Sequence, residues 1–477
     1  VLSAAKDVSP AVRLGALLTL RRWQHPAVGQ FLNDADPFLV AEAAMAINDE
    51  PILAALPQLA AKVTQASRLA AAGPLAEPTL RRIINAHFRI GQPANAATVV
   101  SFVTSAAVPE ALRVDALLAL GDWAKPSGRD RVVGLWRPLP ARDASIATTA
   151  LQPVFSGLLL GGPVELRVTA AKVAGKVQLT AAIPTLHTVV TDTKSPAVAR
   201  VAALEALNVL KSPRLAEMVK LVQSDADETV RIQANRLFIR LNPSAAPSLL
   251  GRLLDAGTLR ERQDALAALA GLTDKPKADP LFLSMVDKLL AGKVPPELHL
   301  DIVEHARSRT NALVKAKYSA WLATKGTNDP LAEWRETFVG GNAEEGKKQF
   351  ERVELACLRC HKLNNEGGIV GPDLTGVGKR QPREYLLESI VHPNSKIATG
   401  FEDVLVVLKN GQSYAGRLKM ETDHELTLDS PEDGEIKVKK SDLKRRERSL
   451  SAMPDNFLRV MSKWDLRNLV EFLANQK

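Results

Sequence analysis

A short phrase recurs along the first two-thirds of the sequence and restricts what the chain can fold into. In each copy an arginine is followed three residues later by an alanine, within a largely apolar stretch. The copies lie at residues 12–17, 112–117, 166–170, 199–204, 230–234 and 261–266. From Arg167 onward the arginines are spaced by 33, 31 and 31 residues. This period predicts an array of helical hairpins.

Each copy carries the pattern of a helix with one buried face. Apolar residues recur at i, i+3, i+4 and i+7, and the alanine lets a neighbouring helix approach closely. Helix-start signals such as Asp36-Pro37 precede several copies. Because one hairpin cannot bury its apolar face alone, we expect about eight hairpins to stack into a continuous core. The phrase resembles HEAT repeats, which implies a right-handed α-solenoid over residues 1–330.

Two features of this array need separate interpretation. The segment 121–163 departs from the period, so we expect an irregular or inserted unit there. The repeated arginine has two explanations: it contacts an acidic partner, or it ties one hairpin to the next through hydrogen bonds and ion pairs. The second explanation is favoured, because an arginine stem also covers apolar surface between hairpins.

The composition narrows the class of protein. A chain of 477 residues is too long to fold around a single hydrophobic core, so we expect about two to four domains. The 62 basic and 53 acidic residues give a net charge of +9, a mild excess that demands no nucleic-acid partner. No stretch approaches the roughly 20 apolar residues of a membrane-spanning helix. Residues 1–10 contain neither a starting methionine nor a signal-peptide pattern, so we expect a C-terminal piece of a longer protein.

Both cysteines of the chain belong to one motif, Cys357-Leu358-Arg359-Cys360-His361. This CxxCH spacing is typical of c-type haem attachment, because two thiols on one helical turn reach the two vinyl groups of a porphyrin while the adjacent imidazole binds iron. A zinc site needs about four ligands, and the sequence has no second CxxC or HxxxH. A thioredoxin-like dithiol needs a preceding strand, which the sequence does not predict. We therefore predict one haem c, attached through Cys357 and Cys360, with His361 as the proximal iron ligand.

The surroundings of the motif resemble a class I cytochrome c. Four residues match the crossing of the family's first and last helices, and glycine is expected at the contact. They are Gly346, Phe350, Leu469 and Phe472. The resemblance also implies that the carbonyl of Pro372, in the stretch 371–378, accepts a hydrogen bond from the proximal imidazole and fixes its orientation. We expect this domain to span residues 331–477.

The sixth position of the iron needs a soft or nitrogen donor if the domain only carries electrons. Met453 is followed by a proline in a loop-like stretch and matches the family's distal loop, so we predict it as the distal ligand. The other candidates in the domain are Met420, Met461, His392 and His424. Met461 is expected to face a helix core. An open or histidine-ligated iron is the alternative, and an open iron would allow catalysis or gas sensing.

Between Pro393 and Met453 the chain is longer than a compact cytochrome c requires. Short runs rich in valine and leucine predict a β-meander inserted at about 401–445. The expected strands are 401–408, 413–418, 425–428 and 435–438. Together with His392-Pro393-Asn394 and the later Met-Pro pair, this plan resembles the large PVC-type haem-binding CxxCH proteins. In those proteins the repeats and the cytochrome domain follow a β-propeller resembling quinoprotein sugar dehydrogenases. This sequence has no propeller, so dehydrogenase activity is not expected from this chain alone.

The basic run at 437–448 is most simply a solvated face, and its alternative is a docking patch for an acidic redox partner. The whole pattern predicts a mainly α protein that carries electrons on a helical-repeat scaffold, from a dehydrogenase donor to a downstream acceptor protein. Two other functions remain open: an interaction scaffold with structural haem, and a haem sensor or enzyme with an open distal site. Haem c is attached beyond the cytoplasmic membrane, so we expect a periplasmic or otherwise exported bacterial protein.

Overall fold

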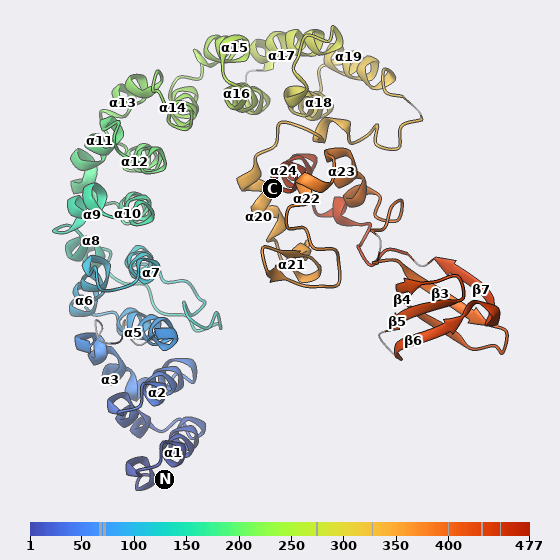
Figure 1. Cartoon of the computed structure of the whole chain (residues 1–477). Helices are drawn as coiled ribbons and strands as arrows, with labels where there is room; N and C mark the ends of the chain where they lie inside the picture. Colours follow the sequence, from blue (N-terminus) through green and yellow to red (C-terminus); the bar gives the residue numbers. More distant parts are fainter. Residues whose placement is uncertain are drawn as a thin grey trace. The chain divides into compact units, whose positions relative to one another are not determined.

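The computed structural model describes residues 1–65, 69, 73–272, 275–326, 328–398, 400–430, 433–448 and 450–477. Contacts divide the chain into two compact units, Val1–Ser244 and Ala245–Lys477. Helices make up most of the first unit and are the main regular structure of the second, to which a small antiparallel sheet also belongs (Figure 1). The predicted mainly α fold with inserted strands is confirmed. None of the described helices has the length and apolar character needed to cross a bilayer.

The first unit stacks its helices in two rows, and the arginine phrase belongs to the first row. The first row contains α1 (Pro10–Arg22), α2 (Pro37–Asp49), α5 (Ala76–Ile90), α7 (Glu110–Gly121), α10 (Val164–Lys176), α12 (Ala197–Val209) and α14 (Glu228–Leu241). The second row contains α3 (Leu56–Ala60), α6 (Pro93–Thr104), α8 (Ser145–Leu151), α9 (Phe155–Gly161), α11 (Ile183–Thr191) and α13 (Leu215–Val222). Figure 1 shows the two rows side by side within this unit. The apolar faces of both rows meet in one continuous core.

The segment 121–163 departs from this regularity, as its sequence predicts. A loop over 122–144 precedes the two short helices α8 and α9. Trp123 is fully buried and meets the edge of Phe88, with ring centroids 5.6 Å apart. The buried carboxylate of Asp130 accepts a hydrogen bond from Arg89 at 2.9 Å. The loop is therefore held against α5 by an aromatic contact and an ion pair.

The repeated arginine ties its helix to the end of the preceding helix in the other row. The Nε groups of Arg113, Arg167 and Arg200 donate to the carbonyl oxygens of Val103, Leu159 and Val190 at 2.9, 2.7 and 3.0 Å. Arg200, only 3% exposed, also donates from Nη1 to Asp225 at 3.1 Å. The hydrogen bond from Arg200 lowers the pKa of Asp225, against the opposing effect of burial. The structural explanation of the arginine is confirmed at these positions.

Replacing Arg200 with alanine is expected to destabilise the protein by about 3–5 kcal/mol, because the buried carboxylate of Asp225 loses its partner. The control is Arg214→Ala, which breaks an exposed pair with Glu217 at 2.6 Å and is expected to cost less than about 1 kcal/mol. Urea unfolding followed by circular dichroism measures both. If the two variants lost the same free energy of unfolding, the proposed role of Arg200 as a buried link between neighbouring helices would be contradicted.

The second unit begins with five helices that pack against one another and then adds a group of helices around the C-terminal helix. The continuing helices are α15 (Ala246–Ala256), α16 (Leu259–Gly271), α17 (Lys275–Leu290), α18 (His299–Ser308) and α19 (Ala312–Ala323). The later helices are α20 (Ala343–Phe350), α21 (Cys357–Cys360), α22 (Val377–Arg380), α23 (Arg383–Val391) and α24 (Lys463–Ala474), and α24 contacts α20, α22 and α23. The domain boundary at residue 330 stays a prediction.

Helices α20 and α24 cross at a glycine. Asn342 caps α20 by accepting hydrogen bonds from the next backbone N–H groups, at 2.9 and 3.3 Å. A Cβ at Gly346 would lie 1.9 Å from the carbonyl oxygen of Asn468, so the two backbones approach this closely only with glycine there. One turn further on, the rings of Phe350 and Phe472 pack with centroids 5.5 Å apart. The structure thus contains the helix crossing that the cytochrome c resemblance implies.

A buried ion pair joins α24 to α18. Asp301 accepts hydrogen bonds from Nη1 and Nη2 of Arg467 at 2.6 and 3.2 Å, and from Nε1 of Trp464 at 3.1 Å. Both charged groups are buried. In addition, Gln263 of α16 donates to the carbonyl of Gly340 at 2.8 Å. The last hairpins of the array and the C-terminal helix therefore share polar contacts inside one unit.

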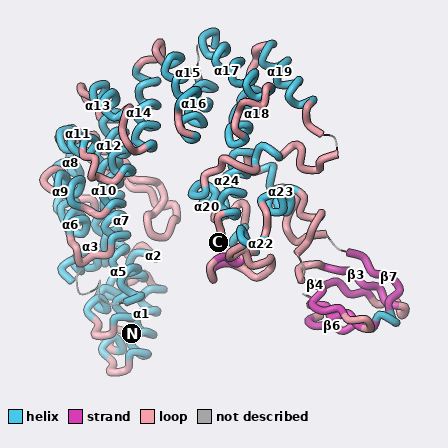
Figure 2. The backbone as a smooth tube through the Cα atoms, turned by 45° about the horizontal axis from the view of Figure 1, so that its top comes forward, coloured by secondary structure: helices cyan, strands magenta, loops and turns pink. Residues whose placement is uncertain are grey.

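The inserted sheet has five antiparallel strands in the order β6-β5-β4-β3-β7. They are β3 (Asp403–Leu408), β4 (Ser413–Glu421), β5 (Glu425–Ser430), β6 (Gly434–Lys439) and β7 (Leu443–Arg448), which Figure 2 shows in magenta. The first four form the predicted meander. Strand β7 was not predicted, because after Leu443 its side chains are all charged and exposed and show no alternation. It returns across the sheet to pair with β3. A shorter ladder joins β1 (Lys362–Leu363) to β2 (Glu366–Gly367).

Replacing Gly346 with alanine is expected to destabilise the second unit by about 1–3 kcal/mol, because the added Cβ forces α20 and α24 apart. The control is Gly251→Ala in α15, where the nearest heavy atom to a new Cβ lies at an ordinary 3.5 Å. Alanine there is expected to be neutral or to stabilise the helix by up to about 1 kcal/mol. Thermal unfolding measures both variants, and a neutral Gly346→Ala would refute the close crossing.

Candidate haem site

The CxxCH motif forms a single helical turn. Helix α21 consists of Cys357–Cys360 and follows Ala356, whose backbone is left-handed with a φ of 52°. The N–H of His361 donates to the carbonyl of Cys357 at 2.8 Å and closes the turn. The motif therefore has the helical geometry that its spacing predicts.

The imidazole of His361 is held in one orientation. Its Nδ1 lies 2.8 Å from the carbonyl oxygen of Pro372. Because a carbonyl only accepts, Nδ1 carries the hydrogen and Nε2 keeps its lone pair. Gly371 lies against the ring, where a Cβ would be 2.7 Å from Cε1. Burial lowers the pKa of His361, although the hydrogen bond to Pro372 acts in the opposite direction. The ring is therefore neutral at pH 7, which is the form that binds a metal.

An apolar cavity lies beside His361. Its lining comes from α20, α21, α23, α24 and the loop before α24. The lining residues are Phe350, Leu355, Cys357, His361, Leu374, Ile390, Met453, Phe457, Met461, Leu469 and Leu473. Cofactor sites of ordinary size hold several hundred Å³. At about 40 Å³ this cavity is smaller, so its side chains must move apart to admit a haem.

The thiol of Cys357 is largely shielded from water. Burial is the main cause that raises its pKa to about 11, with a smaller contribution from the neighbouring Cys360. In the haem-free chain Cys357 is therefore a neutral thiol at pH 7. A neutral thiol belongs in an apolar wall, and it is also the group that adds to a vinyl double bond to give a thioether.

Two of the sixth-ligand candidates reach this cavity. Met453, half-buried, lies in the loop before α24, where its N–H donates to Oγ of Ser451 at 3.1 Å. Met461 is 6% exposed and lines the same cavity. The burial of Met461 could have been predicted from the sequence. Ser462 caps α24 in a capping box, and an apolar residue directly before such a cap commonly packs against the first turn of the helix.

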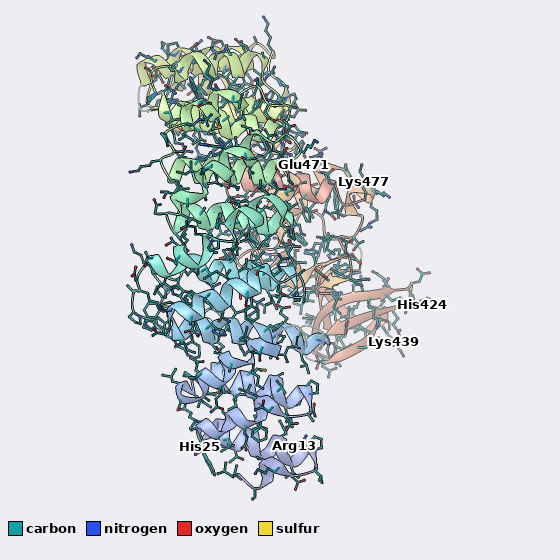
Figure 3. The ribbon with its side chains drawn as sticks, turned by 90° about the vertical axis from the view of Figure 1, so that its left-hand side faces the viewer. Arg13, His25, His424, Lys439, Glu471 and Lys477 are labelled. Carbon is teal, nitrogen blue, oxygen red and sulfur yellow. The ribbon has the colours of Figure 1, made fainter. Side chains whose placement is uncertain are left out.

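The other candidates lie elsewhere. Met420 is 52% exposed on β4. Nε2 of His392 is 3.1 Å from the carbonyl of Pro330. His424 is exposed in the turn between β4 and β5, where Figure 3 labels it. Among the residues that line the cavity, the thioether donors are therefore Met453 and Met461, and the choice of Met453 stays a prediction.

These residues fit a c-type haem. The cavity offers a neutral imidazole with a free Nε2, a thioether from either Met453 or Met461, the thiol of Cys357 and apolar walls, which are the groups that hold a haem c. Within the described ranges, no three side chains of His, Cys, Asp or Glu gather closely enough to hold a metal ion.

Comparisons with known proteins agree with this geometry. Residues 343–423 match the family model for cytochrome c. Human deoxyhypusine hydroxylase is 18% identical, over 49% of this chain and 91% of that one, with a TM-score of 0.22. The complex of CpcE and CpcF of phycocyanin lyase from Nostoc sp. PCC7120 is 14% identical, over 62% and 94%, with a TM-score of 0.27. No curated protein matches the chain. The cytochrome c match thus falls within the second unit, after most of the helical hairpins.

Proposed function

We propose that the second unit carries one haem c and transfers electrons. Cys357 and Cys360 hold the haem through thioether bonds, His361 binds the iron on one side and Met453 binds it on the other. The observation that best supports this assignment is the apolar cavity lined by Cys357, His361 and Met453 together. The family match over 343–423 supports the same conclusion.

A bound haem would supply an iron that alternates between the ferric and ferrous states. The chain's own residues exclude water from that iron and hold its ligands. Phe350, Leu469 and their neighbours form a dry wall, and Pro372 keeps Nδ1 of His361 protonated. Two thioethers in one cavity favour a closed iron, because a ligand on the sixth position blocks small molecules. A closed site favours electron transfer over catalysis or gas sensing.

The wider setting follows from the same assignment. The helical array over 1–330 positions a haem domain over 331–477, in the arrangement of PVC-type haem-binding proteins. The domain receives electrons from a dehydrogenase, either an upstream propeller or a separate partner, and passes them to an acceptor protein. Because haem c is attached outside the cytoplasm, the protein works in the periplasm or another exported location. The basic side chains of β7 pair in part with Glu421 and Glu402, which favours a solvated face over a docking patch.

The first test is covalent attachment. Expressed in a host with haem c maturation, the chain is expected to gain the mass of one haem and to be coloured after denaturation. Cys357→Ala together with Cys360→Ala is expected to abolish both signals, whereas Met420→Ala, outside the cavity, retains them. Mass spectrometry of the denatured protein measures the added mass. A wild-type chain without the mass of one haem would contradict the proposed haem attachment.

The second test concerns the sixth ligand. Met453→Ala is expected to remove the far-red absorption band of methionine-ligated ferric haem, because its sulfur no longer binds. Met461→Ala is expected to keep the band but to destabilise the domain by about 2–5 kcal/mol, the usual cost of truncating a buried methionine. The reverse result in the two spectra would assign the ligand to Met461.

A third test uses the raised pKa of Cys357. Alkylation requires the thiolate, so in the folded, haem-free chain the rate at Cys357 is expected to reach half its maximum only near pH 11. In urea the midpoint is expected to fall to the ordinary value of about 8.5. Peptide mapping after timed alkylation measures both rates. A midpoint that is the same in folded and unfolded chains would contradict the burial of this thiol.

A further inference from the structure

The loop that carries Pro372 is held partly from outside the cytochrome helices. Two backbone hydrogen bonds of this loop, residues 364–376, go to residues close by in the sequence. The N–H of Gly371 donates to the carbonyl of Cys360 at 2.7 Å, and the N–H of Leu374 donates to the carbonyl of Lys362 at 2.8 Å. The carbonyl of Val370 instead accepts a hydrogen bond from Nη2 of Arg417 on β4, at 2.7 Å. Val370 is two residues from Pro372, with Gly371 between them.

Arg417 is well placed to hold that carbonyl. Its guanidinium lies over the ring of Phe401, 4.8 Å from the centroid. In the sheet its Cα partners are Asp403 on β3 and Asp429 on β5, so a carboxylate stands beside it on each neighbouring strand. The guanidinium of Arg417 is therefore supported by an aromatic ring and bonded to the proximal loop. After Pro372 the loop is held by other contacts, since Arg380 donates to the carbonyl of Asp373 at 2.9 Å and Leu374 lines the cavity. Before Pro372 the side chain of Ile369 is 79% exposed, so Arg417 holds the less covered end of the loop.

The same sheet is also followed in the sequence by the loop that carries Met453, on the distal side of the cavity. Strand β3 pairs with β4 on one side and with β7 on the other, as Figure 1 shows. Strand β7 ends five residues before Met453. At the start of that loop, Ser451 N–H donates to Oδ1 of Asn394 at 2.7 Å, in the segment that precedes β3. The inserted sheet thus connects to the loops of both proposed axial ligands.

We propose that Arg417 is a positioning residue for the proximal ligand: by holding the Val370 carbonyl, the inserted sheet keeps the carbonyl of Pro372 on Nδ1 of His361. This inference rests on the proposed function, because its effect on iron requires His361 as a ligand. A firm hydrogen bond from Nδ1 makes the imidazole more basic. A more basic imidazole stabilises ferric over ferrous iron, so it lowers the reduction potential.

The test compares three variants of β4. Arg417→Met removes both the hydrogen bond and the positive charge. Arg417→Lys keeps the positive charge but replaces the planar guanidinium with an ammonium group. The control Lys419→Met removes one positive charge from the same strand by breaking an exposed pair with Glu435 at 2.5 Å, away from the loop. Removing a nearby positive charge by itself lowers the potential, which is opposite to the effect expected from a looser Pro372 carbonyl.

Two readouts are needed. In both haem-free and haem-loaded protein, hydrogen exchange at the amides of Gly371 and Leu374 is expected to rise about fivefold in Arg417→Met, the effect of one ordinary hydrogen bond. Lys419→Met is expected to leave it unchanged. In loaded protein the reduction potential is expected to be higher in Arg417→Met than in Lys419→Met. It is also expected to be higher in Arg417→Lys than in the wild type, because lysine weakens the contact but keeps the charge.

The outcomes separate this inference from the proposed function. If haem attaches but Arg417→Met matches Lys419→Met in exchange and potential, the positioning role is refuted while the haem assignment stands. Faster exchange with an unchanged potential also refutes it, because the contact is then only structural. If no haem attaches and exchange still rises, the electron-transfer proposal fails, although the contact between sheet and loop is established.

Discussion

The close approach of α20 and α24 at Gly346 is the contact on which the proposed haem site depends. It brings Phe350 and Leu469, far apart in the sequence, to one wall of the cavity. Helix α20 leads into the turn that carries the cysteines, and α24 follows the loop that carries Met453. A side chain at position 346 would separate these two segments. One absent Cβ therefore links the proximal and distal sides of the site.

Polar contacts then fix α24 from two further directions. Asp301 of α18 holds Arg467 and Trp464, and Arg383 of α23 pairs with Glu471 at 2.7 Å. The pair of Asp301 with Arg467 is buried, and breaking a buried pair is costly because it leaves an uncompensated charge. Arg200 makes a similar buried pair with Asp225 in the helical array, where Arg113 and Arg167 instead bind backbone carbonyls.

The parts of the structure that were predictable from sequence depend on local residue types. The hairpin period, the cap at Asn342 and the turn of CxxCH each follow from a few neighbouring residues. The crossing at Gly346 joins residues far apart in the sequence and was expected from the resemblance to class I cytochrome c. Strand β7 was missed because an exposed edge strand needs no apolar alternation; its pairing with β3 is a tertiary contact. Met461, expected to face a helix core, is buried in that core, and it also lines the cavity, which its local sequence did not indicate. The bond from Arg417 to Val370 joins residues 47 positions apart, and no local pattern marks it.

The contact of Asp301 with Arg467 and Trp464 bears on how such proteins can be assembled from exchangeable parts. A cytochrome segment cut at Gly341 would expose the guanidinium of Arg467, which the intact chain buries, and would free the half-buried indole of Trp464 from its partner. It would also leave the carboxylate on α18 without its counter-ion. We therefore expect recombination of the cytochrome segment alone to give an unstable protein. A gene fusion that keeps these contacts transfers α16 to α18 together with the segment.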